Sequence, residues 1–380
     1  MIKISKWSRG FRSPLLFMVD DLANIYFSRE GGDWGGKTTE KDGLFSFLEE
    51  HFVARCSGLR FTFFLVAGVR TIQSSGDYDY ARSCDVGAFP DFIKYIESKG
   101  HEIAYHGLTH GTLLPNRQFV QEWSAFESLE EATETTQKGL SIVSKALGRT
   151  IRGGKFCGYE SGSYGHNSLV ENNIAWWFDK WDENELARPD GELIDSVFYF
   201  PSNVDCSRYG LEQIFNVPLK KYLTSNYRSF FHGSIKRKIS KIYQNQGIIT
   251  LQEHTSPLRT DGVIQYPNVV SDKPQIQTIL DYISDMSIWY ATATEVYCYI
   301  MMRRNTKLLE TDNELVIEFT GSSKLLNYLI GENTEITILL DRNIELPIGY
   351  KVECNKNGMF FQIPARKLQQ PLQFKKCKGL

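Results

Sequence analysis

The sequence predicts an α/β protein: a distorted barrel of roughly seven to eight β/α units, followed by a small antiparallel β domain. Three observations predict this organisation. Short apolar runs recur up to about residue 300, helix-like segments separate them, and the pattern changes near residue 303. The chain has 380 residues, which is enough for one large and one small domain.

The apolar runs have the composition of strands that are buried on both faces. Such runs with helices between them are typical of a parallel sheet covered on its outside. They lie at 15–19, 59–68, 101–106, 174–178, 196–200, 247–254 and 287–293, with 150–156 as a weaker candidate.

Two segments between these runs have apolar residues at helical spacing. The first, 89–100, ends in Gly100, and the second, 128–148, ends in Gly148. Glycine is the usual residue just beyond a helix C-terminus. The second segment also has acidic residues in its first turns, where they favour the positive end of a helix dipole. Both segments are therefore expected to be helices.

The expected domain border lies between residues 303 and 304. The barrel is expected over 1–303, with 183–246 as a candidate insertion that caps one barrel face. Residues 304–380 are expected to form a small β-rich accessory domain, which contains no histidine and is expected not to be catalytic. Its alternating strand-like stretches are 314–319, 335–340 and 358–363.

Composition narrows the function classes. Lysine and arginine number 43 against 45 acidic residues, so the net charge is −2, and no basic excess indicates nucleic-acid binding. Seven cysteines without a C-x-x-C pair indicate reduced thiols. The first residues do not have the pattern of a secretory signal, and no apolar run is long enough to span a membrane. The expected location is cytoplasmic.

Polar residues at the strand ends form the candidate site. In a β/α barrel, active-site groups project from the C-terminal ends of the strands, so these side chains are expected to converge on one rim. The residues are Asp20, Asp21, His106, His110, Lys155, Tyr159, Asp179 and His254.

Asp20 and Asp21 follow directly on a buried apolar run. Two buried, unpaired carboxylates are costly, so the alternatives are a solvated turn or a positive group that holds them. His106 and His110 are four residues apart, which on a helical turn puts their Cβ atoms roughly 6 Å apart. Two imidazoles and one carboxylate make a three-ligand set that leaves a position open for water on zinc or a similar ion.

The sequence resembles the polysaccharide deacetylase superfamily (carbohydrate esterase family four). "MVDDL" (18–22) looks like its T-F-D-D-G motif, and "GHEIAYHGLTH" (100–110) closely resembles its G-H-E-I-x-x-H-S/T-x-x-H motif. "IITLQEH" (248–254) looks like the strand that delivers the family's catalytic histidine. The resemblance covers about 15–300 and does not extend to 304–380.

Four departures from the family pattern stand out. Leu22 replaces the glycine after the aspartate pair, and Gly107 replaces the serine or threonine after the first histidine. Lys155 stands where the third motif has arginine, and 176–182 is only loosely similar to the fourth motif. The metal site and the base thus look intact, whereas the groups that orient the base and shape the sugar subsite are remodelled.

The resemblance implies one divalent metal ion bound by Asp21, His106 and His110, with Asp20 as general base and His254 as general acid. Zinc is the expected ion, with cobalt, nickel, iron and manganese as alternatives. Glu253 either orients His254 or points the other way. Further candidates for contacting substrate or orienting the base are Lys155, Tyr159, Asp179 and Trp177. For Lys155 the alternative is a surface charge, and for Trp177 it is a core position.

The implied activity is metal-dependent removal of an N-acetyl group from an amino sugar in a glycan or glycan precursor, in bacterial surface polysaccharide biosynthesis. The implied partner is an N-acetylated sugar, an oligosaccharide or a carrier-linked glycan. A deformylase or another linear-amide hydrolase of the same fold is one alternative. A carbohydrate-binding or scaffold protein with impaired catalysis is the other. The sequence does not predict the oligomeric state.

Overall fold

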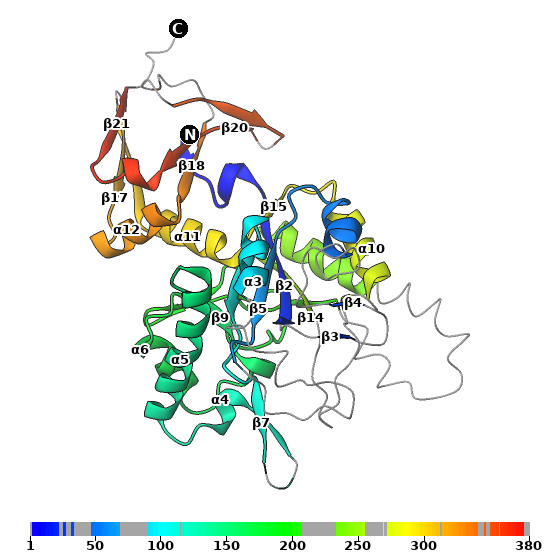
Figure 1. Cartoon of the computed structure of the whole chain (residues 1–380). Coiled ribbons are helices and arrows are strands. Elements are labelled where there is room, and N and C mark those ends of the chain that lie inside the picture. Colours follow the sequence, from blue (N-terminus) through cyan, green and yellow to red (C-terminus); the bar gives the residue numbers. More distant parts are fainter. Residues whose placement is uncertain are drawn as a thin grey trace. The chain divides into compact units, whose positions relative to one another are not determined.

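The computed structural model of the chain (Figure 1) forms two compact units, Met1–Leu15 with Asp285–Leu380, and Leu16–Ser284. The expected border at 303 and 304 stays a prediction, as does the cap at 183–246, of which 207–232 lies outside the described residues. The structure describes residues 2–22, 26–27, 32–33, 47–68, 90–114, 116, 118–206, 233–254, 269, 272–311, 314–340, 346, 350–356 and 358–375.

The larger unit is built on a curled, mixed sheet in the order β11-β12-β10-β9-β6-β5-β2-β14-β13. Neighbouring strands are parallel wherever a register is defined, except that β11 and β12 are antiparallel. The strands are β2 (Ser13–Leu22), β5 (Phe61–Leu65), β6 (Glu102–Tyr105), β9 (Gly153–Lys155), β10 (Trp176–Phe178), β11 (Glu192–Ile194), β12 (Val197–Tyr199), β13 (Val204–Asp205) and β14 (Ile249–His254).

This sheet confirms the predicted α/β barrel type, in the form of a curled half-barrel. Every apolar run named from the sequence contains a strand, including the weak run at 150–156, which is β9. Because β9, β6, β5, β2 and β14 are successive neighbours, their carboxyl ends lie along one rim. That rim carries the candidate site.

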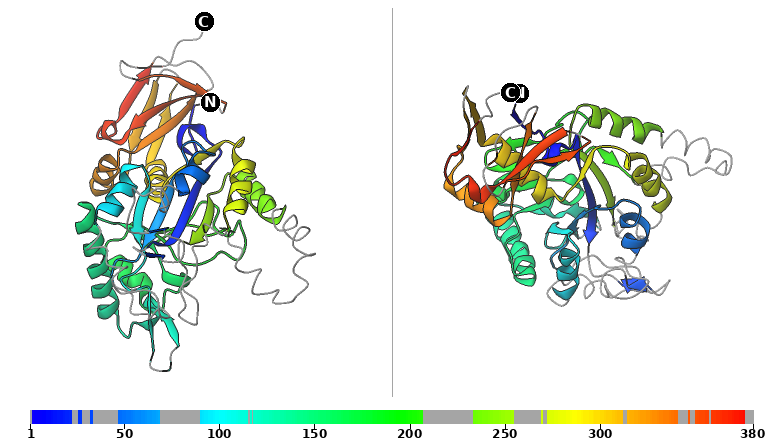
Figure 2. Two further views of the ribbon diagram at one scale, coloured as in Figure 1. Left: turned by 45° about the vertical axis from the view of Figure 1, so that its right-hand side comes forward. Right: turned by 90° about the horizontal axis from the view of Figure 1, so that it is seen from above.

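Helices lie outside the curled sheet in both views of Figure 2. Both helices expected from the sequence are present as α3 and α5. Ser128 caps α5 by accepting a hydrogen bond from the N–H of Glu131 at 3.1 Å, and Gly148 ends it with φ 75°. The helices of this unit whose two ends lie within the described residues are η2 (Glu49–Val53), α3 (Pro90–Ser98), α4 (Glu122–Ala125), α5 (Leu129–Leu147), η4 (Cys157–Tyr159), α6 (Gly165–Glu171) and α10 (Lys273–Ile283), and residues 233–244 are also helical. Two small hairpins pair β3 (Tyr26–Phe27) with β4 (Gly32–Asp33), and β7 (Gly111–Leu113) with β8 (Phe119–Gln121).

The smaller unit is mainly antiparallel. Its sheets have the orders β1-β18-β20-β19 and β16-β17-β21, and β15 pairs with Ser13–Leu15 of β2. The expected β-rich segment also contains a helix, α12, whose N-cap Ser322 accepts from the N–H of Leu325 at 3.2 Å. The elements are β1 (Lys3–Ile4), η1 (Ser8–Gly10), β15 (Ile288–Tyr290), α11 (Ala293–Arg304), β16 (Thr306–Glu310), β17 (Glu314–Phe319), α12 (Ser323–Gly331), β18 (Glu335–Leu340), β19 (Glu353–Asn355), β20 (Gly358–Pro364), η5 (Ala365–Lys367) and β21 (Leu372–Lys375). Within the described ranges, no helix has the length and apolar character needed to cross a bilayer.

The strand signal of β9 in the sequence is weak because two of its three residues are glycine. A Cβ atom at Gly153 would lie 1.9 Å from the Trp176 indole, and one at Gly154 would lie 2.4 Å from the Trp177 indole. Both tryptophans belong to the neighbouring strand β10. The glycines therefore make room for two large rings rather than for a turn, which explains the weak strand signal.

His101, which precedes β6, should make the free energy of unfolding depend on pH. Its Nδ1 accepts a hydrogen bond from the N–H of Phe61 at 3.2 Å, and burial lowers the pKa of His101 to about 4. Between about pH 4 and 6.5 the unfolded chain binds a proton that the folded chain does not, so stability rises with pH by about 3 kcal/mol. Urea unfolding of chelator-treated protein from pH 4.5 to 8 measures this rise.

The matched variant is His101→Asn, which keeps an acceptor near the Nδ1 position and cannot titrate. Its stability should rise less steeply over that interval, because the contributions of all other groups cancel in the comparison with the parent protein. Parallel stability curves for the two proteins would show that His101 is not the titrating group.

Candidate active site

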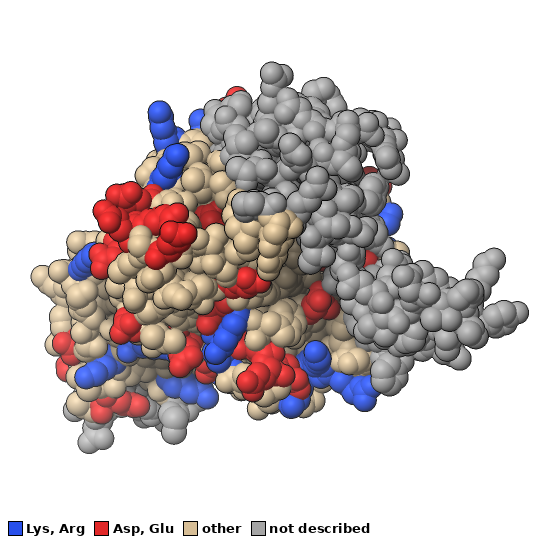
Figure 3. Space-filling model, turned by 90° about the horizontal axis from the view of Figure 1, so that it is seen from below, with Lys and Arg blue, Asp and Glu red and all other residues tan. Residues whose placement is uncertain are grey.

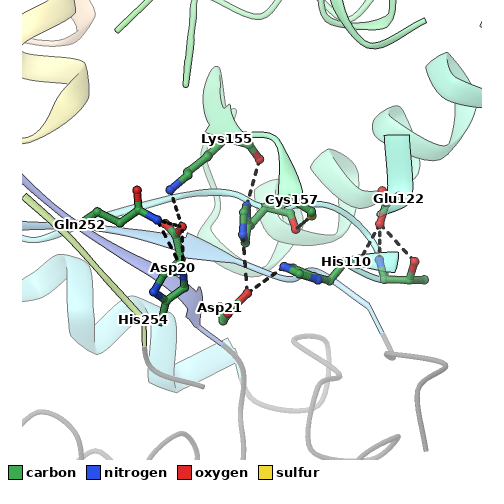
Figure 4. A network of polar contacts seen from close by, with 10 residues as sticks. Asp20, Asp21, His110, Glu122, Lys155, Cys157, Gln252 and His254 are labelled. Carbon is green, nitrogen blue, oxygen red and sulfur yellow. Dashed lines mark hydrogen bonds and ion pairs between the residues drawn. The ribbon is translucent and has the colours of Figure 1, made fainter. Parts of the chain in front are cut away.

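The end of β2 has an irregular register that turns Asp20 and Asp21 to different partners. Val19 pairs with Phe63 and Leu22 with Leu65, so three steps on β2 match two on β5. Asp21 has φ 61°, a left-handed conformation that is uncommon for a residue other than glycine. Both aspartates are buried, with exposed fractions of 3% and 2%. In Figure 4 the Asp21 carboxylate faces His110, and the Asp20 carboxylate faces Lys155, Gln252 and His254.

Asp21 lies between the two histidines. Its Oδ1 is 3.0 Å from Nε2 of His110 and 3.6 Å from Nε2 of His106. Nδ1 of His106 is 3.0 Å from the carbonyl oxygen of Lys155. A carbonyl only accepts, so Nδ1 carries the proton and the Nε2 lone pair points to Asp21. Burial lowers the pKa of His106 to about 4, so the ring is neutral, as a metal ligand must be.

These three side chains fit a divalent metal ion. Two imidazole nitrogens and a carboxylate oxygen converge in a buried place, where a cation would interact with all three at once. His110 also has φ 67°, so two of the three candidate ligands are in left-handed conformations. Such strain collects at functional sites, where the surrounding structure holds it. Residues 106–110 form a loop between β6 and β7, so the helical-turn spacing of the two histidines does not apply.

Cys157 is a second candidate ligand that the sequence did not single out. One ligand atom each of His106, His110 and Cys157 lie within 4.8 Å of one another, which is a spacing that could hold an ion. The thiol, however, donates to the carbonyl oxygen of His106 at 3.1 Å. Asp21 brings a negative charge to both Nε2 atoms, so we favour Asp21 as the third ligand.

Asp20 is held by a different set of groups. Lys155 forms a buried ion pair with Oδ2 of Asp20, and its side chain is only 1% exposed, which excludes a surface charge. Nε2 of Gln252 lies 3.4 Å from the same oxygen, and Nε2 of His254 lies 3.7 Å from it. Burial opposes the charge of Lys155, but Asp20 and Tyr159 outweigh it and raise the pKa of the lysine. Lys155 therefore stays charged beside the carboxylate.

Tyr159 completes this side of the site. The ammonium of Lys155 lies 4.1 Å from the centre of its ring, a cation–π contact. Burial raises the pKa of Tyr159 to about 12, so the phenol stays protonated and donates to Oε1 of Gln252. Gln252 can then direct its N–H groups at Asp20. Tyr159 thus acts on Asp20 through its neighbours.

Strand alternation separates His254 from Glu253. Gln252 and His254 face Asp20, whereas Glu253 is fully buried on the other side of β14. Burial, with Asp272 and Asp205, raises the pKa of Glu253 well above the usual range. Oε2 of Glu253 lies 3.4 Å from the backbone N–H of His254, so its carboxylate contacts the backbone of His254, on the opposite face of β14 from the His254 ring.

Two further candidates are not brought to the cluster. Trp177 is fully buried and packs against Trp123 and Phe156, with ring centres 5.8 and 5.3 Å apart, so the core interpretation holds. Asp179 forms an ion pair with Arg188 at 2.8 Å, and Arg188 also binds Asp182 at 2.7 Å. The loosely similar fourth motif therefore contributes an ion-pair network rather than a group that contacts Asp20.

Sequence reasoning missed Gln252, Cys157 and Glu122. Gln252 is two residues before His254, so the alternation of β14 could have revealed it. Glu122 is the first residue of α4, and no spacing links it to the histidines. Its carboxylate accepts backbone hydrogen bonds from the loop that carries them.

One face of the molecule carries exposed side chains of both charge signs. On the described part of the face in Figure 3, basic and acidic side chains are interspersed. Such a surface lacks the continuous positive field that attracts polyanions. The absence of a nucleic-acid partner remains a prediction from the sequence.

The fold and the rim together define a curled α/β barrel with a carboxylate–histidine site at its strand ends. Solved structures of polysaccharide deacetylases, including a family 4 carbohydrate esterase, align with most of the chain at low identity. A protein described as a polysaccharide deacetylase from Mycobacterium smegmatis is 15% identical with TM-score 0.47, covering 81% of this chain and 96% of its own.

Two other solved structures also align with this chain. PuuE allantoinase is 14% identical with TM-score 0.48 over 78% of this chain and 92% of its own. The family 4 carbohydrate esterase from Streptomyces lividans, solved with acetate, is 12% identical with TM-score 0.37 over 73% and 92%. No protein-family model matches the sequence, and the search of curated proteins finds no match.

Proposed function

We propose that this protein is a metal-dependent hydrolase that removes an N-acetyl group from an amino sugar in a glycan or glycan precursor. The observation that carries the proposal is the division of labour between two adjacent aspartates. Asp21 faces two imidazole nitrogens, while Asp20 is held by a buried ammonium within reach of a third histidine. Amide hydrolysis needs both a cation site and an acid–base pair.

Asp21, His106 and His110 would hold the ion. A divalent ion supplies Lewis acidity, which lowers the pKa of water and polarises the scissile carbonyl. Asp20 takes the proton from the attacking water, and Lys155 holds that carboxylate in place. His254 donates a proton to the nitrogen of the leaving amine, since an unprotonated amide nitrogen leaves poorly. The balance is one water and one N-acetyl group consumed, and one acetate and one amine formed.

The finer proposal is that the substrate is a precursor of a bacterial surface polysaccharide. This proposal rests on the sequence resemblance. The same residues would serve a deformylase, because a formyl and an acetyl group differ only in a methyl and their hydrolysis needs the same cation, base and acid. Release of acetate or of formate from matched substrates distinguishes the two. A scaffold protein would bind the sugar and release neither.

We expect about one divalent ion per chain, the stoichiometry of a single three-ligand site. Elemental analysis of protein purified without chelator measures this value. His106→Ala should lose the ion and release no acetate from N-acetylglucosamine oligomers. His166→Ala is the matched control, because His166 binds Asp195 and Tyr199 away from the site, at 2.8 and 2.6 Å. If His106→Ala still binds about one ion per chain, the proposed ligand set is wrong. If the parent protein binds the ion but releases no acetate, the proposed hydrolase activity is wrong.

A further inference from the structure

Glu122 is a buried carboxylate that lies against the loop between the two site histidines. It is 4% exposed. Its Oε1 accepts from the N–H of Leu108 at 2.9 Å, and its Oε2 accepts from the N–H groups of Thr109 at 2.6 Å and His110 at 3.0 Å. The Thr109 hydroxyl donates to the same Oε2 at 3.2 Å. Three consecutive backbone N–H groups thus converge on one side chain, as Figure 4 shows in part.

Successive backbone N–H groups that point to one place form an anion-binding site called a nest. Here the bound anion is the carboxylate of Glu122. Buried N–H groups need partners, and a loop between strands has no ladder to supply them. The backbone of Glu122 adds a return bond, from its N–H to the carbonyl oxygen of His110 at 3.2 Å. Side chain and main chain of one residue therefore hold His110 in its left-handed conformation.

Gly107 allows the carboxylate to come this close. It has φ 86°, and a Cβ atom there would lie 2.8 Å from Oε2 of Glu122 and 3.1 Å from Sγ of Cys157. A serine or threonine at this position would collide with the carboxylate. The presence of Glu122 thus explains why this chain has glycine at 107, where the family pattern has serine or threonine.

We propose that Glu122 is a positioning residue that shapes the backbone of residues 107–110 and so aims His110 at Asp21. The proposal rests on the proposed function, because the aimed imidazole is a candidate metal ligand. Glu122 reaches Nε2 of His110 only through the backbone, and Nε2 lies 3.0 Å from Oδ1 of Asp21. Partners that orient a ligand typically contribute a factor of about 10–100 to metal affinity.

The first test measures zinc affinity by competition with a chromophoric chelator. Glu122→Ala should bind Zn²⁺ about 10–100-fold more weakly than the parent protein, and Glu122→Gln, which keeps one acceptor oxygen, should lose less. Glu160→Gln is the control: Glu160 is exposed and binds Ser124 of the same helix α4 at 2.8 Å. Gly107→Ala leaves Glu122 unmutated but puts a methyl group 2.8 Å from Oε2 of its carboxylate, so it should also weaken Zn²⁺ binding.

The second test needs no metal. Hydrogen–deuterium exchange of chelator-treated protein should show faster exchange of the amides at 108–110 in Glu122→Gln and unchanged exchange in Glu160→Gln. Parent-like exchange in Glu122→Gln overturns the proposal. Faster exchange with unchanged zinc affinity in both Glu122 variants also overturns it, because the loop would then be held without consequence for the site. Failure of the parent protein to bind zinc would instead refute the proposed function, and exchange would still decide whether Glu122 holds the loop.

Discussion

Asp21→Asn is expected to lower metal affinity by more than about 100-fold, the upper end of what a lost orienting partner costs. Turnover should fall with it. The substitution removes a charge that lies 3.0 and 3.6 Å from two imidazole nitrogens. Asparagine adopts left-handed conformations more readily than most residues, so the backbone at φ 61° should be kept. Zinc competition and acetate release measure the two effects.

Asp195→Asn is the matched control for this variant. Asp195 also has a positive φ, 51°, but its side chain is 70% exposed and faces His166. The same chemical change there should leave zinc affinity unaltered. Equal zinc affinity of Asp21→Asn and the parent protein would remove Asp21 from the ligand set and leave Cys157 as the third candidate.

Asp20→Asn is expected to keep its metal and to reduce turnover by roughly 10²–10⁴, the usual contribution of a positioned general base. It should also be less stable by about 3–5 kcal/mol, because it leaves the buried ammonium of Lys155 without its carboxylate. The lysine side chain is 1% exposed, so water cannot replace the lost partner. Metal content, single-turnover rates and urea unfolding measure the three quantities separately.

The double variant Asp20→Asn with Lys155→Met separates stability from chemistry. Replacing the stranded ammonium with an apolar side chain should restore much of the lost stability, whereas turnover should stay low because no base is present. Turnover restored along with stability would mean that Asp20 serves only to neutralise Lys155. Loss of metal in Asp20→Asn would mean that the two aspartates bind the ion jointly.

Local patterns carried the sequence-based prediction a long way. The runs that became β2 and β5 are strongly apolar, so their existence follows from burial. Parallel neighbours put their carboxyl ends on one rim, so the sequence alone makes Asp20, Asp21, His106 and His254 candidates. The ligand set and the acid–base pair remain predictions, and the geometry brings the atoms they require to one place.

Other features depend on contacts between residues far apart in the chain. No local pattern shows that Lys155 pairs with Asp20 rather than with water, since the choice depends on which strands become neighbours. Trp177 was a candidate sugar contact, but Gly154 on the neighbouring strand leaves space for its ring in the core.

The sequence by itself determined most strands of the large sheet and the residue types at their ends, because apolar runs and the residues that follow them are local properties. Only the tertiary structure decided the directions of the side chains. The irregular register between β2 and β5 sends two adjacent carboxylates to different partners, and Glu122 shapes the loop that aims His110. Both depend on hydrogen bonds across the fold, and such bonds leave no period in the sequence.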